Sequence, residues 1–307
     1  MSPSSQTPSF RRSRVVVPTV ALALLAWASA VAPADAGLQS PSVTTERLGG
    51  SVSVLYGSGG NLAVSSGEDG VLVVDSQFAR MAAAIRGELD GLVGGEGTEP
   101  VFLVNTHFHS DHVGGNVELG RGSRIVAHRN VRRRMEAGDG PGGQRIEPSP
   151  PAALPIVTFE DELSLWFNGE EVRIRHLPAG HTDGDALVWF TGSNVVHLGD
   201  TFFNERFPYV DVPSGGSIRG LVDGLGELLA ELPDDVAIIP GHGPAGGKAE
   251  LAGYVEMLRE SAARVRAALA DGRTLADMQA VRLLDDYSDW GDGNGFLPVV
   301  VQSVMAE

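Results

Sequence analysis

The 307-residue chain contains no cysteine and a single lysine, Lys248. The absence of cysteine excludes disulfides, thiolate metal ligands and a cysteine nucleophile, so a metal site in this chain has to use histidine and carboxylate side chains. Positive charge is also scarce, because 23 basic residues stand against 39 acidic ones and the formal net charge is −16. A chain this acidic repels nucleic acids and anionic lipids, and we expect neither as a partner.

The N-terminal 36 residues have the pattern of a signal peptide. Arginines within residues 11–14 precede a run at 15–30 that is dominated by Val, Ala and Leu, and an A-x-A cleavage site ends at Ala36. The run is shorter than the roughly 20 apolar residues of a spanning helix, so we expect no stable membrane insertion after cleavage. An uncleaved anchor is the alternative. The pattern predicts a periplasmic or secreted protein.

The rest of the chain alternates short apolar runs with helical stretches. Residues 37–47 are polar and predict a loose leader, and residues 48–307 predict one domain with a helical extension from about 247. Strands followed by a helix, then more strands and more helices, indicate an α/β (α+β) fold, a four-layer αββα sandwich. The expected strands are 51–56, 61–65, 71–75, 101–104, 124–127, 163–167, 172–176, 186–191, 194–198 and 236–239, and the expected helices are 78–92, 130–137, 221–232, 249–269 and 274–281.

One short segment concentrates the chemistry. Directly after the buried run 101–104, three imidazoles and a carboxylate fall within six residues, His107, His109, Asp111 and His112. Side chains two apart in an extended chain point the same way, so the first three converge. A helix that begins after Asp111 would bring His112 beside them. Imidazole and carboxylate are the ligands that zinc accepts in the absence of thiolate.

The motif His107-x-His109-x-Asp111-His112 resembles the signature of the metallo-β-lactamase superfamily. Three further motifs follow in the family's order, at residues 180–184, 197–201 and 240–243, so that the resemblance covers roughly residues 48–245. It implies the metallo-β-lactamase fold and two Zn²⁺ ions per chain. The first metal would be held by His107, His109 and His181, the second by Asp111, His112 and His242, and Asp200 would bridge both.

The resemblance implies a dinuclear zinc hydrolase that acts on a small molecule. A hydroxide shared by the two ions would attack an ester, thioester, lactone or amide-type bond, and Asp111 would also relay a proton. The alternatives are a β-lactam hydrolase, an iron-dependent oxidoreductase of the same fold, and an exported metal-binding protein without turnover. Metal content and a panel of substrates distinguish these hypotheses.

The substrate is less well defined by the sequence. β-Lactamases that use cysteine as a ligand are excluded, and Phe203 stands where those enzymes carry a lysine. The retained Asp200 is more similar to glyoxalase II and related thioesterases or lactonases. The tail after residue 271, however, has only Arg273 and Arg282 as basic residues, which argues against glutathione. An aromatic run (Phe202, Phe203, Phe207 and Tyr209) either lines an apolar pocket mouth or packs in the core.

Four polar residues outside the ligand set have expected roles as well. We interpret His128, His176 and His197 as structural histidines. Asp75 ends an apolar run and resembles the family's strand-end aspartate. It either orients a ligand through a hydrogen bond or is a plain turn residue, and the sequence leaves both open.

Overall fold

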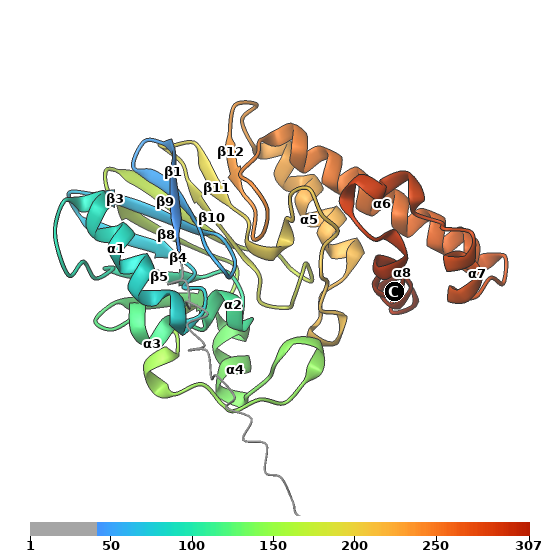
Figure 1. Cartoon of the computed structure of the whole chain (residues 1–307), viewed down its shortest axis with the longest axis horizontal. Coiled ribbons are helices and arrows are strands. Elements are labelled where there is room, and N and C mark those ends of the chain that lie inside the picture. The colour runs from blue at the N-terminus through green and yellow to red at the C-terminus, as the bar shows by residue number, and fades with distance from the viewer. Residues whose placement is uncertain (1–41) are drawn as a thin grey trace, which may run out of the picture. The chain divides into compact units, whose positions relative to one another are not determined.

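The computed structural model describes residues 42–307. The expected signal peptide at 1–36 lies outside the described residues. Two β-sheets pack face to face, and helices cover their outer faces, as Figure 1 shows. This four-layer arrangement confirms the predicted αββα sandwich. In the part of the chain from residue 42 onward, no helix is both long and apolar enough to cross a membrane.

The first sheet has seven strands in sequence order from β1 to β7. Strands β1 to β4 pair antiparallel, and β4 to β7 pair parallel. The strands are β1 Thr44–Gly49, β2 Val52–Tyr56, β3 Leu62–Gly67, β4 Gly70–Val74, β5 Phe102–Asn105, β6 Arg124–His128 and β7 Val157–Phe159.

The second sheet has five strands in the order β12-β11-β10-β9-β8. Only the pair β11 and β12 is parallel among them. The strands are β8 Glu162–Phe167, β9 Glu170–His176, β10 Ala186–Phe190, β11 Val195–His197 and β12 Ala237–Ile239.

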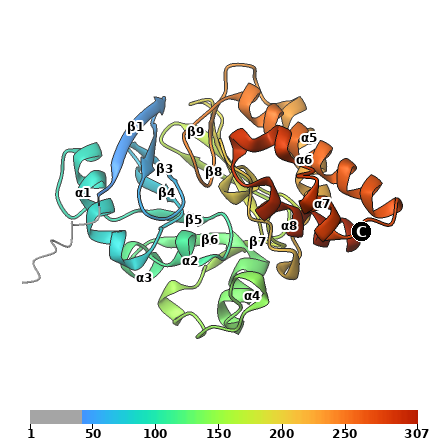
Figure 2. The same ribbon diagram turned by 45° about the vertical axis from the view of Figure 1, so that its right-hand side comes forward.

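Helix α1 lies on the outer face of the first sheet, and α5, α6 and α8 lie on that of the second. Figure 2 shows α6, α7 and α8 gathered at the C-terminal end of the chain. The helices are α1 Ala82–Val93, α2 Ser110–Val113, α3 Asn116–Leu119, α4 Arg129–Ala137, α5 Ile218–Glu231, α6 Lys248–Ala270, α7 Leu275–Ala280 and α8 Gly293–Met305. Short 3-10 turns occupy Ala79–Met81, Pro141–Gly143, Pro151–Ala153, Gly199–Thr201, Val212–Ser214 and Asp285–Trp290.

The strand sequences explain the layering, because alternate residues of a strand face opposite sides of the sheet. In β4, Leu72 and Val74 point into the core between the sheets, while Val71 and Val73 pack under α1. Strand β10 likewise sends Val188 into the core between the sheets and Leu187 into the core under the C-terminal helices. Both sheets are therefore covered on both faces, which requires nearly continuous apolar strands.

The elements that the sequence analysis did not predict include β1, β7, α3 and α8. Strand β1 begins at Thr44, inside the region expected to be a loose leader at 37–47. It pairs with β2 through its backbone, and its mostly exposed side chains carry no apolar alternation that would predict a strand. Helix α8 was not predicted, because it contains two glycines and Pro298. Burial of Phe296, Leu297 and Val300 compensates for this poor helix propensity.

Candidate metal centre

Strand ends of both sheets deliver the predicted ligands to one place. His107 and His109 follow β5, and α2 begins at Ser110, so Asp111 and His112 sit on its first turn. His181 lies beyond the end of β9, Asp200 beyond β11 and His242 beyond β12. The pairing directions of β9 to β12 run these three strands the same way, so their carboxyl ends share one edge of the second sheet.

The seven side chains form two adjacent groups of potential metal ligands. His107, His109, His181 and Asp200 make one group, in which the ligand atoms all lie within 4.8 Å of one another, and Asp111, His112 and His242 make the other. In the first group, His181 Nε2 is 2.9 Å from His109 Nδ1. In the second, His242 Nε2 is 3.2 Å from Asp111 Oδ2.

Asp200 faces both groups with its two carboxylate oxygens. Oδ2 lies 3.8 Å from His107 Nε2 and 3.6 Å from His181 Nε2. Oδ1 lies 3.0 Å from His112 Nε2 and 3.5 Å from His242 Nε2. The structure thus brings all seven predicted ligands together, and it places Asp200 in the shared position that the resemblance implies.

Three atoms that face this centre are buried and lack a hydrogen bond of acceptable geometry within residues 42–307. They are His107 Nε2, His112 Nε2 and Asp200 Oδ1. A buried polar atom without a partner costs about 1–3 kcal/mol, and orphaned atoms that point at one another call for a shared partner. Five imidazoles and two carboxylates suit zinc or another divalent transition metal. The residues therefore fit a metal centre.

In four of the imidazoles, the ring nitrogen that does not face the centre contacts a polar group of the chain. This contact orients each ring. His112 Nδ1 is 2.7 Å from Asp75 Oδ2, and His109 Nε2 is 3.0 Å from Asp211 Oδ2. Asp75 Oδ2 also accepts from Thr106 Oγ1, and its Oδ1 accepts from the Thr106 amide. Asp75 is therefore the orienting partner of a predicted ligand and not a plain turn residue. Such partners fix the tautomer and direction of a ligating histidine.

Sequence reasoning missed three of these partners. Asp211 is fully buried, and its Oδ2 also accepts from the Gly142 amide. His181 Nδ1 donates to the Tyr209 carbonyl at 2.8 Å, and Thr106 Oγ1 is 3.1 Å from His107 Nδ1. Thr106 stands inside the motif and was detectable there. Asp211 follows no strand and belongs to no motif, so the sequence offered no signal for it.

Burial and mutual charge set opposite pKa shifts within the centre. Burial lowers the pKa of the His107 imidazole well below its ordinary value, and the neighbouring His112 lowers it further. Burial also opposes a charge on His112, but the carboxylates of Asp200 and Asp75 raise its pKa well above the usual range. His242 follows the same pattern, with its pKa raised to about 9 by Asp111 and Asp200 against the effect of burial. A metal ion that binds here has to displace these protons.

The aromatic run divides between the two expected roles. Phe202 is fully buried and packs edge-on against Tyr254, with the ring centroids 5.2 Å apart. Phe203 stacks on the His242 ring at 5.2 Å, beside the centre. Phe207 stacks on Phe296 at 4.7 Å, whereas Tyr209 is 43% exposed and flanks the rings of His109 and His181. The run thus supplies both core packing and walls of the site.

The three remaining histidines lie outside the ligand groups. The rings of His128 and His176 are stacked 3.9 Å apart, and the His176 Nδ1 bonds to the Asp185 carbonyl. His197 is fully buried, and its Nε2 is 2.9 Å from the Asn61 carbonyl oxygen. All three make structural contacts.

This histidine stack predicts an acid-sensitive contribution to stability. Burial, and then His176, lower the pKa of His128 to about 4. The unfolded chain takes up this proton near pH 6.5 and the folded chain only near 4, so the contribution is complete above 6.5 and is lost as the pH falls towards 4. Urea unfolding of metal-free protein at pH 7 and pH 5 measures the loss. We expect a smaller loss in His128→Gln, and an equal loss in both proteins would contradict the expectation.

The sandwich and the paired ligand groups together define a metal-binding αββα protein. A family model described as the metallo-beta-lactamase superfamily matches residues 55–242, and the chain belongs to this superfamily.

Curated relatives include hydroxyacylglutathione hydrolases and a probable metallo-hydrolase. The hydroxyacylglutathione hydrolase of Gloeobacter violaceus is 32% identical over 180 residues, which is 56% of this chain and 62% of that protein. The hydroxyacylglutathione hydrolase GloC of Haemophilus influenzae is 32% identical and the match covers 46% of this chain and 68% of that protein. The chain therefore spans less than two thirds of the length of the first of these relatives.

Solved structures share the fold at low sequence identity. The DIM-1 metallo-beta-lactamase superposes with a TM-score of 0.59 and 17% identity, over 72% of this chain and 99% of that one. The metallo-beta-lactamase from Pontibacter korlensis gives the same TM-score with 14% identity, over 71% of this chain and 99% of that one.

Proposed function

We propose that this protein is a dinuclear zinc hydrolase that cleaves an ester, thioester, lactone or amide-type bond of a small molecule. The observation that carries the proposal is the position of Asp200, whose two oxygens face two separate ligand groups. A single-metal site would not need a carboxylate shared in this way. Relatives named hydroxyacylglutathione hydrolase and probable metallo-hydrolase support the hydrolase class.

His107, His109 and His181 would hold the first metal, and Asp111, His112 and His242 the second, with Asp200 between them. Bound zinc supplies a water whose pKa is near neutral and an electrophile for the scissile carbonyl. The chain itself orients the ligand rings through Asp75, Asp211, Thr106 and the Tyr209 carbonyl. No side-chain nucleophile is required.

Asp111 is the residue we assign to proton transfer. Its side chain is 27% exposed, whereas that of Asp200 is 6% exposed, so Asp111 is the ligand carboxylate that solvent and substrate can reach. Its Oδ2 lies 3.2 Å from His242 Nε2. Burial raises the pKa of Asp111, but the contacts with His242 and His112 lower it overall, so the carboxylate is ionised.

β-Lactam hydrolysis is the second candidate function. The fold likeness to solved metallo-beta-lactamases motivates it, although that likeness concerns architecture only. The shared Asp200 favours an ester or thioester instead. For the compartment, we propose export to the periplasm or beyond the cell, which the signal-peptide pattern in residues 1–36 supports.

The proposal is tested by a substrate panel run on zinc-loaded protein, with metal content measured in parallel. The panel contains chromogenic esters, a glutathione thioester, a lactone and a cephalosporin. We expect two zinc ions per chain and hydrolysis of at least one ester or thioester. A chelator should abolish this activity, and added zinc should restore it.

Three outcomes would overturn parts of this proposal. One iron per chain would favour the oxidoreductase alternative. A protein that binds zinc yet hydrolyses no member of the panel would favour a metal-binding role without turnover. Cleavage of the cephalosporin alone would replace the ester class with β-lactams.

A further inference from the structure

A surface groove of about 420 Å³ lies between the chain after Asp200 and the C-terminal helix α8. Most of its walls are apolar, and their residues come from two segments that are far apart in the sequence. The lining residues are Arg206, Phe207, Pro208, Tyr209, Trp290, Asp292, Gly295, Phe296 and Val299. Pockets of this size hold small organic ligands.

The groove is built on fixed contacts. The Phe207 ring stacks on Phe296 with an interplanar angle of 21°, and the Phe207 amide donates to the Trp290 carbonyl at 3.0 Å. Asp292, the acidic residue of the groove, is engaged as the cap of α8, where it accepts from the Asn294 amide at 3.1 Å. A ligand would therefore meet a largely preformed surface.

Tyr209 borders both this groove and the metal centre. Its ring is a wall of the groove and lies 6.0 Å from the His109 ring and 5.8 Å from the His181 ring, measured between centroids. Its carbonyl oxygen holds His181 Nδ1. The groove therefore lies next to the predicted ligands His109 and His181.

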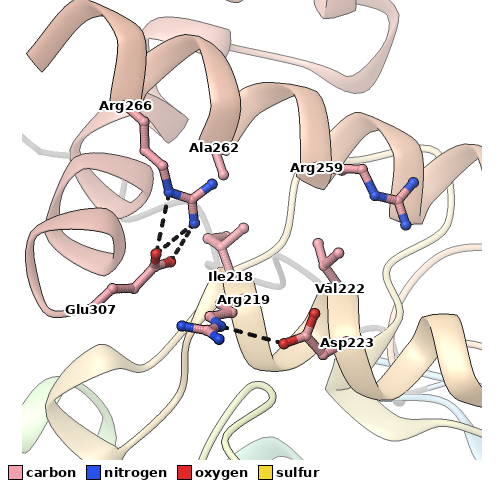
Figure 3. A pocket seen from close by; sticks show the side chains of 8 residues that line it. All are labelled: Ile218, Arg219, Val222, Asp223, Arg259, Ala262, Arg266 and Glu307. Atoms are coloured by element: carbon pink, nitrogen blue, oxygen red, sulfur yellow. Dashed lines mark hydrogen bonds and ion pairs between the residues drawn. The ribbon is translucent and has the colours of Figure 1, made fainter. Parts of the chain in front are cut away.

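Arg206 differs from the arginines of the other surface hollows. In the hollow between α5 and α6, Arg219 pairs with Asp223 and Arg266 with Glu307, as Figure 3 shows, and Arg259 pairs with Glu256. The arginines of the hollow beside α4 (Arg129, Arg132 and Arg133) are also paired with carboxylates. Arg206 makes no ion pair with any residue of the described chain, so its charge is available to a ligand.

We propose that this groove, called here the Arg206 groove, binds the apolar part of the substrate and that Arg206 binds a carboxylate of the substrate. The inference rests on the proposed hydrolase function and narrows it to substrates with an apolar chain or ring that ends in a carboxylate. The carboxylate of such a substrate complements Arg206, the one cation among the described residues that line the groove. The apolar body complements the rings of Phe207, Tyr209 and Trp290.

The test compares two series of 4-nitrophenyl esters on zinc-loaded enzyme. One series carries unbranched monoacids from acetyl to octanoyl, and the other carries half-esters of dicarboxylic acids of matching length. We expect Arg206→Ala to raise KM for the best half-ester about fivefold, the upper range for an exposed ion pair, with kcat unchanged. Val299→Trp should lower kcat/KM for long chains about tenfold and leave the acetyl ester within twofold.

Arg219→Ala is the matched control, because Arg219 is similarly placed on the surface but lines a different hollow. Binding of 4-phenylbutyrate, followed by calorimetry, provides a readout that does not need turnover. Arg206→Ala should weaken this binding about fivefold and Val299→Trp about tenfold, and Arg219→Ala should leave it unchanged. Equal affinity of the wild type and all variants for 4-phenylbutyrate would contradict the proposal that the Arg206 groove binds substrate. This holds whether or not an ester is cleaved. Absence of chelator-sensitive acetyl-ester hydrolysis in the wild type would instead refute the proposed hydrolase function.

Discussion

Replacement of Asp200 with alanine is expected to remove bound metal and hydrolysis together, with kcat/KM falling by more than about 100-fold. Partners that lie one step behind the ligands already contribute about 10–100-fold to metal affinity or activity, and Asp200 is the proposed shared ligand. Both of its oxygens face histidine nitrogens of the two groups. Metal content by mass spectrometry and steady-state hydrolysis of the best ester measure the two effects.

Asp223→Ala serves as the control for this replacement, because that side chain is 66% exposed on α5. It should leave metal content and rate unchanged. If Asp200→Ala retained two metals and full activity, the site would have been assigned to the wrong residues. Thermal unfolding in chelator should show that both variants fold.

Asp75→Asn and Asp211→Asn are each expected to weaken the binding of a different one of the two proposed metal ions. Asp75 orients His112 of one ligand group, and Asp211 orients His109 of the other. Each change should lower affinity at its own site about 10–100-fold. Asparagine retains the size of aspartate and tolerates the positive φ of 64° at Asp75. Its Oδ1 can still accept from the Thr106 amide, but its Nδ2 would then face His112 Nδ1, where the carboxylate oxygen now accepts.

Calorimetric titration of metal-free protein with Zn²⁺ measures the affinity of the two proposed sites separately. In the wild type we expect two binding events, and each variant should weaken one of them and spare the other. An identical effect of both variants on a single binding event would contradict the division into two sites. Asp235→Asn is the control, because Asp235 makes an exposed contact with Asn194. It should leave metal affinity at both sites unchanged.

The convergence of the seven proposed ligands was predictable because their chemistry is local. Histidines and aspartates follow the apolar runs that become β5, β11 and β12, so a strand assignment already places them at sheet ends. The orienting residues were less predictable. Asp75 left two interpretations open, and the bond from Asp211 to His109 spans 102 residues and depends on how the loop before α5 folds back.

Local pattern also limited the fold prediction at both ends of the domain. Strand β1 has the sequence TTERLG, which lacks the alternation that half-buried strands show, and only its backbone pairing makes it a strand. Helix α8 contains Gly293, Gly295 and Pro298, which disfavour a helix when the chain is read alone. Tertiary burial decides both elements.

The origin of the ligands also bears on how the domain unfolds. His107, His109, Asp111 and His112 follow a strand of the first sheet, and His181, Asp200 and His242 follow strands of the second. Neither sheet alone supplies both sets of donors. Bound ions would therefore cross-link the two sheets at one end of the sandwich. We expect the loaded protein to open as a single cooperative unit and the chelated protein to allow one half to open first, a difference that amide hydrogen exchange would register along β5 and β11.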